Sequence, residues 1–220
     1  MKKFAIILSG SGVYDGSEIH ETTMTMLAIK RQGSDYDIFA PDIEQHHVIN
    51  HYTGEMTDDK RNVLVESARI ARGDIKPLSR FEASVYDAIV MPGGFGAAKN
   101  LSSFAFHGTS CTVDPDTEKA IKSIHEQGKP IGALCISPVV VAAVLEKGKY
   151  TIGQDKESSE AIAGFGGEHV QTTHGKVFID KENNIFTTPC YMLDANILQI
   201  AEGAENIIKA ISEQLENNQS

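Results

Sequence analysis

Short apolar runs, each ended by a glycine or proline and followed by an amphipathic stretch, recur along this chain. Four of these runs are KFAIILSG, YDIFAP, YDAIVMPGGFG and KPIGALC. The stretch after the first run, EIHETTMTMLAIKRQG, places apolar residues at helical spacing and ends at a glycine. Strands that alternate with helices in this way form a parallel sheet with helices on its faces. The pattern therefore predicts an α/β fold of the doubly wound type.

The rest of the chain extends this pattern without a break between domains. Helix signals occur in TDDKRNVLVESARIARGD, in residues 114–127 and in residues 194–216, and KVFIDKENNIFTTP is typical of a hairpin. Residues 42–80 are less regular and form an insertion whose role the sequence leaves open. Since the chain contains no repeat, low-complexity tract or linker, we predict a single domain over residues 1–220.

Composition narrows the class of partner and the compartment. The formal net charge of −10 over 220 residues disfavours nucleic acid and anionic membrane surfaces, because both would repel the protein. The first apolar run is too short for a signal-peptide core, and no run approaches transmembrane length. Three cysteines without close spacing indicate neither a disulfide framework nor a zinc knuckle. We therefore expect a cytoplasmic protein that binds neither nucleic acid nor membranes.

Three turns follow strands that are distant from one another in the sequence: SGSGVYDGSE, MPGGFG and LCIS. In open α/β sheets, ligands bind outside the carboxyl ends of the strands. Because the fold would bring these three turns together, we predict the functional site there.

The main candidate in these turns is Cys135, which lies between a buried strand and a helix. The segment ALCIS has small residues two positions before and after the cysteine, as in a nucleophile elbow, and the next proline suits a first helical turn. A cysteine at a helix N-terminus should have a lowered pKa. The backbone N–H groups of Ile136 and of Gly94 or Phe95 would hold a developing oxyanion. The alternative is a buried, inert thiol.

Two glutamates, Glu18 and Glu21, lie at the start of the first predicted helix, just after the first glycine turn. Because they are three positions apart on a helix, both can face the same region. A glutamate that faces a thiol in a dry pocket would have a raised pKa and would exchange a proton with substrate. Alternatively, the two acids only stabilise the positive end of the helix.

A histidine can also activate a cysteine nucleophile, but the residue directly after Cys135 is isoleucine. His169, in GFGGEHV, is the first candidate, and the others are His174, His107 and His20. Each of these histidines is more often an ordinary polar residue than a catalytic one.

Two other motifs give weaker signals. His47 and His51 have a spacing compatible with metal ligands on a helix, but they lack the glutamate of a zincin motif, so we expect no metal. GSGVYDG has its third glycine one place late for the dinucleotide fingerprint G-x-G-x-x-G, so we expect no nucleotide cofactor.

Several longer segments resemble the ElbB (enhancing lycopene biosynthesis) branch of the ThiJ/PfpI superfamily, which is class I glutamine amidotransferase-like. In order they are LSGSGVYDGSEIHE, FAPD, INHYTGE, RNVLVESARIARG, VMPGGFGAAKNLS, CTVD, GKPIGALCISP and TTPCYML. The resemblance covers nearly the whole chain. It implies a flavodoxin-like three-layer sandwich with a mostly parallel sheet, a homodimer, and an active cysteine at Cys135. The superfamily glutamate falls on Glu21 when counted back from Gly33, with Glu18 as the second choice.

The resemblance also implies a reaction. This is a glutathione-independent glyoxalase (lyase) activity on a small reactive dicarbonyl, which converts methylglyoxal or glyoxal to lactate or glycolate through a hemithioacetal on Cys135, without a cofactor. Two departures disfavour peptidase or amidase chemistry, because Ile136 and Gly153 stand where other members have histidines. Cys135 and Glu21 remain, with His169 as a further candidate. The alternative is a non-enzymatic redox-sensing or stress-response protein that uses the same cysteine and affects isoprenoid biosynthesis indirectly.

Overall fold

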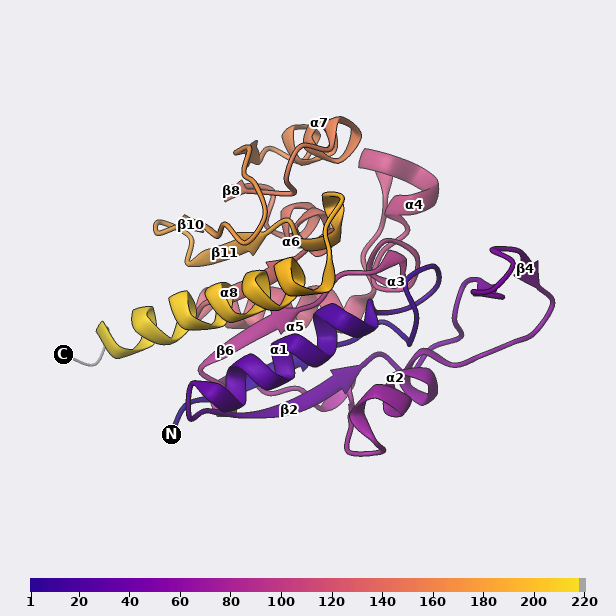
Figure 1. Cartoon of the computed structure of the whole chain (residues 1–220), viewed down its shortest axis with the longest axis horizontal. Coiled ribbons are helices and arrows are strands. Elements are labelled where there is room, and N and C mark those ends of the chain that lie inside the picture. The colour runs from indigo at the N-terminus through magenta and orange to yellow at the C-terminus, as the bar shows by residue number, and fades with distance from the viewer. Residues whose placement is uncertain (218–220) are drawn as a thin grey trace.

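A seven-stranded sheet forms the centre of the protein (Figure 1). The structure, a computed structural model, describes residues 1–217. Neighbouring strands of the sheet run parallel, except that β10 pairs antiparallel with β11. In sheet order the strands are β10 (Phe178–Asp180), β11 (Ile185–Thr188), β7 (Ile131–Leu134), β6 (Ala88–Met91), β1 (Lys3–Ile7), β2 (Asp35–Ala40) and β5 (Lys76–Pro77).

Helices cover both faces of this sheet, which explains why its strands are nearly continuous apolar runs. In β1, Phe4 and Ile6 belong to one apolar cluster, whereas Ala5 and Ile7 belong to the other. The Phe4 cluster includes residues of α1 (Ile19–Arg31), α2 (Val63–Ala71) and α8 (Ile197–Asn217). The Ala5 cluster includes residues of α5 (Pro115–Glu126) and α6 (Ser137–Leu145). Figure 1 shows α1 and α8 side by side, and the predicted three-layer α/β sandwich is confirmed.

Shorter elements complete the described chain. The helices are α3 (Phe95–Lys99), α4 (Phe104–His107) and α7 (Lys156–Gly164). The strands form two small sheets, β3 (Val48–Ile49) with β4 (Met56–Thr57) and β8 (Lys149–Tyr150) with β9 (Glu168–His169). The 3₁₀ turns are η1 (Leu78–Arg80), η2 (Ala83–Val85), η3 (Gly108–Ser110) and η4 (Cys190–Met192).

The elements expected from the sequence are present at the expected places. Residues 114–127 and 194–216 correspond to α5 and α8, and the predicted hairpin is the antiparallel pair of β10 and β11. The irregular insertion contains β3, β4 and α2, and Figure 1 shows β4 projecting away from the sheet. Residues 218–220 of the predicted domain lie outside the described residues.

The topology gathers three turns at one edge of the sheet. From β1 the chain adds β2 and β5 on one side, and it then crosses back to add β6 and β7 on the other side, so the direction of winding switches between β1 and β6. The turns after β1, β6 and β7 meet at this switch, as predicted for a ligand site. Within residues 1–217, every helix is too short or too polar to span a bilayer.

Candidate active site

Cys135 occupies a tight corner between β7 and α6. Its backbone has a positive φ of 57°, a strained conformation for a residue with a side chain. The Cys135 N–H donates to the Thr188 carbonyl at 3.0 Å, and the Ser137 hydroxyl donates to the Pro92 carbonyl at 2.7 Å. These two bonds tie the corner to the neighbouring strands β11 and β6. The predicted strand–cysteine–helix corner is therefore present.

A glycine opposite the corner lets the reactive groups meet. A Cβ added at Gly93 would lie 2.4 Å from the Cys135 Cβ and 2.8 Å from Glu21 Oε2. Real Cβ contacts are essentially never that short, so a side chain at this position would push the thiol and the carboxyl group apart. Gly93 was missed as a site residue in the sequence, although it lies in the MPGGFG turn.

Two backbone amides donate hydrogen bonds to the sulfur of Cys135. They belong to Gly94 and Ile136, two of the three residues expected to hold an oxyanion. The expectation for Phe95 is wrong, because its N–H donates to the Val13 carbonyl at 2.8 Å. The backbone at Gly94 has φ = 96°, and it is this turn that aims its own amide, rather than the next one, at the thiol.

Glu21 is the carboxyl group in contact with the thiol, which settles the choice between the two glutamates. It is fully buried on α1 and is hydrogen-bonded to Cys135. Its Oε2 accepts from the Gly93 N–H at 2.8 Å, and its Oε1 accepts from the Tyr191 N–H at 3.3 Å. Burial first, and then the charge of Glu18, raise the pKa of Glu21 to about 8. Glu21 is therefore mostly a neutral acid at pH 7.

The pKa of Cys135 shifts in the direction opposite to the one expected from its helix N-terminus. Burial, and then the negative charge of Glu21, raise this pKa well above its usual value, while the amides of Gly94 and Ile136 act against the rise. The prediction of a lowered pKa for this thiol is therefore wrong. The residue is only 7% exposed, and desolvating a thiolate costs more than two amides return.

Glu18 holds the start of α1 in place beside the site. It is the N-cap of α1, where its Oε2 accepts from the Glu21 N–H at 2.7 Å. Its own N–H donates to the Gly93 carbonyl at 2.9 Å, which joins the start of α1 to the glycine turn. Glu18 thus combines the helix-capping role considered as the alternative with a place on the wall of the cavity described next.

A cavity of about 740 Å³ lies over the thiol. Five of the residues named as site candidates line it: Cys135, Glu18, Gly94, Phe95 and Ile136. The ring of Tyr191 and the side chain of Met192, from the segment after β11, form part of another wall. Tyr191 was missed in the sequence, since only its tertiary position gives its amide and ring a role.

The candidate histidines lie outside this lining. His169 is on β9, where its ring bonds to the Gly153 backbone, burial lowers its pKa, and its buried Nε2 has no hydrogen-bond partner. His174 is bonded to the Asp194 carbonyl, and His20 to the Tyr191 hydroxyl at 2.8 Å. The structure therefore brings Cys135 and Glu21 together, and none of these rings lines the cavity.

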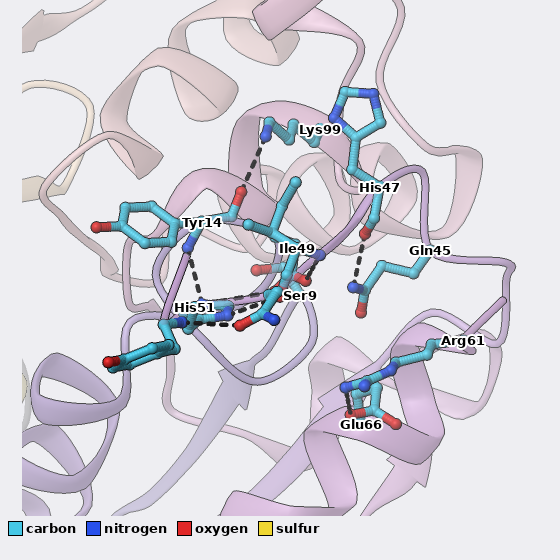
Figure 2. Close-up of polar contacts among 12 residues, drawn as sticks. Ser9, Tyr14, Gln45, His47, Ile49, His51, Arg61, Glu66 and Lys99 are labelled. Atoms are coloured by element: carbon cyan, nitrogen blue, oxygen red, sulfur yellow. Dashed lines mark hydrogen bonds and ion pairs between the residues drawn. The ribbon is translucent and has the colours of Figure 1, made fainter. Parts of the chain in front are cut away.

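The insertion closes over the turn after β1, which residues 10–17 form. Residues 43–62, here called the strap, contact this loop, and Figure 2 shows His51 of the strap beside Tyr14. The buried Asp15 carboxylate accepts from the Ile49 N–H at 2.7 Å, and His51 Nε2 accepts from the Tyr14 N–H at 3.2 Å. The ring of His51 also stacks on Tyr14, with centroids 5.0 Å apart. His51 therefore binds backbone and ring atoms of the loop.

The same loop is held from the opposite side by α3. Figure 2 shows Lys99 Nζ donating to the Tyr14 carbonyl, at 2.9 Å, and Asn100 Nδ2 donates to the carbonyls of Ser9 and Asp15. Val13, between these anchor points, lines the cavity. The strap therefore fixes one wall of the candidate active site, which is a role for residues 42–80 that the sequence left open.

The fold is that of ThiJ/PfpI, DJ-1 and amidotransferase-like proteins. DJ-1β of Drosophila melanogaster has this fold, with a TM-score of 0.54 at 16% identity over 99% of this chain and 97% of that one. A protein from Ehrlichia chaffeensis, described as an isoprenoid biosynthesis protein with an amidotransferase-like domain, matches with a TM-score of 0.90. It is 36% identical, over 96% of this chain and 99% of that one.

Curated relatives show the family. No protein-family model matches the chain. The human glutamine amidotransferase-like class 1 domain-containing protein 3, mitochondrial, is 41% identical over 221 residues, which cover 96% of this chain and 82% of the human protein. The ES1 protein, mitochondrial, of Danio rerio is 31% identical over 94% of this chain and 84% of that protein. The chain therefore belongs to the family of ES1 and glutamine amidotransferase-like class 1 domain-containing proteins.

Proposed function

We propose that the protein is a cysteine-dependent, glutathione-independent glyoxalase that converts methylglyoxal or glyoxal to lactate or glycolate. The observation that carries this proposal is the hydrogen-bonded pair of Cys135 and Glu21 at the cavity, with two amides beside the sulfur. The reaction needs a nucleophile and one group that both removes and returns protons. A carboxyl group with a pKa of about 8 is suited to both tasks near neutral pH.

The first step is addition of the thiol to the aldehyde. Because burial raises the pKa of Cys135, the thiolate forms only as attack begins, when the ionised fraction of Glu21 accepts the thiol proton. The sulfur bonds to the aldehyde carbon and the carbonyl π electrons move to oxygen. The amides of Gly94 and Ile136 stabilise this oxyanion, and Glu21 then returns the proton to it, which gives a neutral hemithioacetal.

The second step moves hydrogen between the two substrate carbons. Glu21 removes the proton from the carbon that bears sulfur and passes it to the oxygen of the neighbouring carbonyl, which gives an enediol. Glu21 then takes the proton of the hydroxyl on the sulfur-bearing carbon and delivers it to the second carbon, so that this hydroxyl becomes the carbonyl of a hydroxyacyl thioester on Cys135. Water hydrolyses the thioester and restores the thiol. One carbon is oxidised and the other is reduced by two electrons, so no external oxidant or reductant is required.

Lactate formation from methylglyoxal by single-residue variants tests this proposal. We expect Cys135→Ala to lower kcat/KM by at least about 1,000-fold and Glu21→Gln by at least about 100-fold, the usual sizes for a nucleophile and a proton-transfer group. Cys111→Ala is the matched control, because Cys111 does not line the cavity, and it should change the rate less than twofold. Unchanged turnover in the Cys135 and Glu21 variants would remove the proposal.

A second candidate is a redox sensor, which Cys190 favours. This second buried thiol lies two residues after the end of β11, the strand that pairs with β7 with Thr188 opposite Leu134. In this mode a peroxide oxidises the Cys135 thiolate to a sulfenate and is reduced to water. The Cys190 thiol then condenses with the sulfenic acid to give a disulfide and water. Mass spectrometry after mild peroxide treatment distinguishes a loss of two hydrogens from the two added oxygens of a sulfinate.

The relatives suggest the biological setting. We infer that the chain belongs to the ElbB branch of its superfamily, with an indirect connection to isoprenoid biosynthesis, as the description of the Ehrlichia chaffeensis protein suggests. A homodimer stays a prediction that light scattering of the purified protein would test. The cytoplasmic location also stays a prediction, and the human and Danio rerio relatives are named as mitochondrial.

A further inference from the structure

We propose that the candidate active site selects carbonyl compounds that carry a positive charge on an apolar or aromatic body, and that it excludes anionic ones. This inference names a substrate class for the proposed function and rests on it. The first observation is size. A cavity of about 740 Å³ lies within the range of pockets that enclose drug-sized ligands. Methylglyoxal, with three carbons, would leave most of this volume to water.

The second observation is charge. Four charged side chains line the cavity, and all four are carboxylates: Glu18, Asp155, Glu157 and Glu160. No lysine, arginine or histidine belongs to the described lining. Glu160 has a cation near it, since Lys156 Nζ lies 3.7 Å away, but that lysine side chain is 88% exposed and such pairs are weak. The net charge of the described lining is therefore negative.

Sources of positive potential lie close to the cavity, among them the N-termini of α6 and α7, but each helix end carries only about half a charge. The N-terminus of α7 carries about half a positive charge, against three full negative charges on Asp155, Glu157 and Glu160. Lys99 lies on α3, next to Phe95, but its ammonium group donates to the Tyr14 carbonyl. It faces a separate hollow of about 200 Å³ lined by Tyr14, Ile49, Gly54, Phe95 and Lys99.

The third observation is the chemistry of the walls. The rings of Phe95, Phe104 and Phe106 and the side chain of Met192 line the cavity together with the carboxylates. Aromatic faces attract organic cations as well as apolar groups, so this combination recognises a cationic substrate with an apolar body. The Phe95 ring already has a cation near one face, since Lys99 Nζ lies 5.4 Å from its centroid. Phosphorylated and carboxylated aldehydes meet repulsion from the same walls.

Labelling of Cys135 by reagents of similar size but different charge tests the preference of the cavity for cations without requiring turnover. The probes are three methanethiosulfonates of similar size, with a trimethylammonium, a neutral alkyl and a sulfonate group. In each reaction the thiolate attacks the sulfenyl sulfur and methanesulfinate leaves, so the chemistry is constant. Second-order rates at the Cys135 peptide, measured by mass spectrometry, are divided by the rates for 2-mercaptoethanol to remove intrinsic differences in reactivity. We expect the normalised rate for the cation to exceed that for the anion at least tenfold at low salt, and less at high salt.

A triple variant identifies the groups responsible. Asp155→Asn, Glu157→Gln and Glu160→Gln together remove three charges, and asparagine at position 155 keeps an N-cap for α7. We expect the cation-to-anion ratio to fall to less than about threefold. The control removes three charges from α5, outside the cavity lining, with Asp116→Asn, Glu118→Gln and Glu126→Gln, and should keep at least half of the original ratio. Equal normalised rates in the unaltered protein, or a ratio that the cavity variant does not change, would overturn the inference.

Turnover measurements with charged substrates distinguish a failure of this inference from a failure of the proposed function. Phenylglyoxal is compared with derivatives that carry a para-trimethylammonium or a para-carboxylate group. We expect kcat/KM to be highest for the cation and lowest for the carboxylate, with at least a tenfold span. A cation preference in labelling without Cys135-dependent turnover of any aldehyde would reject the glyoxalase proposal alone. Turnover of methylglyoxal without any charge preference would reject the substrate class alone.

Discussion

The corner at Cys135 and the strap over the loop of residues 10–17 are built in different ways. The corner combines a local turn, in which β7, the cysteine and the first turn of α6 follow one another within fifteen residues, with buried hydrogen bonds to the distant Thr188 and Pro92 carbonyls. The strap holds its loop through single hydrogen bonds between residues more than thirty positions apart, such as Asp15 with Ile49 and Tyr14 with His51. We infer that the corner tolerates almost no change, whereas the strap yields locally while the sheet stays folded.

Two glycines, one in each region, have the same distance between an added Cβ and its nearest neighbouring atom, and we expect the largest difference between the regions when each is replaced by alanine. A Cβ at Gly93 would lie 2.4 Å from the Cys135 Cβ, and a Cβ at Gly12 would lie 2.4 Å from His51 Nε2. The Cys135 Cβ is fixed by backbone that is bonded to β11, whereas the His51 ring is the end of a partly exposed side chain and can move.

We therefore expect Gly93→Ala to destabilise the protein by about 3 kcal/mol or more and to lower turnover at least about 100-fold, because the thiol and Glu21 are forced apart. Gly12→Ala should cost about 1 to 2 kcal/mol, mostly from its backbone φ of 130°, and should keep a measurable rate. Chemical denaturation together with the lactate assay checks both variants. Equal losses in the two would contradict the proposed difference in rigidity.

The raised pKa of Glu21 makes the stability of the folded protein depend on pH. Its pKa of about 8 in the folded protein lies above its usual value of 4.5, so the folded state binds the proton more tightly than the unfolded chain does. The stability contributed by this proton is complete below pH 4.5 and is lost as the pH rises to about 8. The loss amounts to roughly 4 kcal/mol at pH 8 and to less than about 1 kcal/mol at pH 5.

Glu21→Gln removes this titration, so we expect its stability relative to the unaltered protein to improve by roughly 3 kcal/mol between pH 5 and pH 8. Any packing cost of the glutamine is present at both pH values and cancels in the difference. Urea denaturation at the two pH values measures it, and the exposed-helix variant Glu118→Gln is the control that should show a change near zero. A relative stability that falls with pH would mean that the carboxyl group is ionised in the folded protein.

The difference between local and long-range contacts also explains which features of the protein can be predicted from the sequence alone. The order of apolar runs and turns, and the small residues around Cys135, are local patterns, and they predict the fold and the corner. They left Glu18 and Glu21 as alternatives, and only the family resemblance favoured Glu21. The predicted direction of the shift in the Cys135 pKa was wrong because it depends on how completely the folded chain buries the sulfur, and no local pattern records that burial. The amide of Phe95 and the role of the strap depend on partners distant in the sequence, Val13 and Asp15 among them.

His51 provides the smallest and most local test. Its Nε2 is the acceptor for the Tyr14 N–H, and its side chain is about one-third exposed, so His51→Ala should cost about 1 kcal/mol, the usual net value of such a hydrogen bond. We expect faster hydrogen exchange at Tyr14 and its neighbours, with the exchange of β1 and β6 unchanged, because the strap opens without the sheet. His174→Ala, which loses a bond to the Asp194 carbonyl instead, is the matched control and should leave the loop protected. If His51→Ala speeds exchange across the sheet as well, the strap belongs to the same cooperative unit as the corner, and the distinction between the two regions fails.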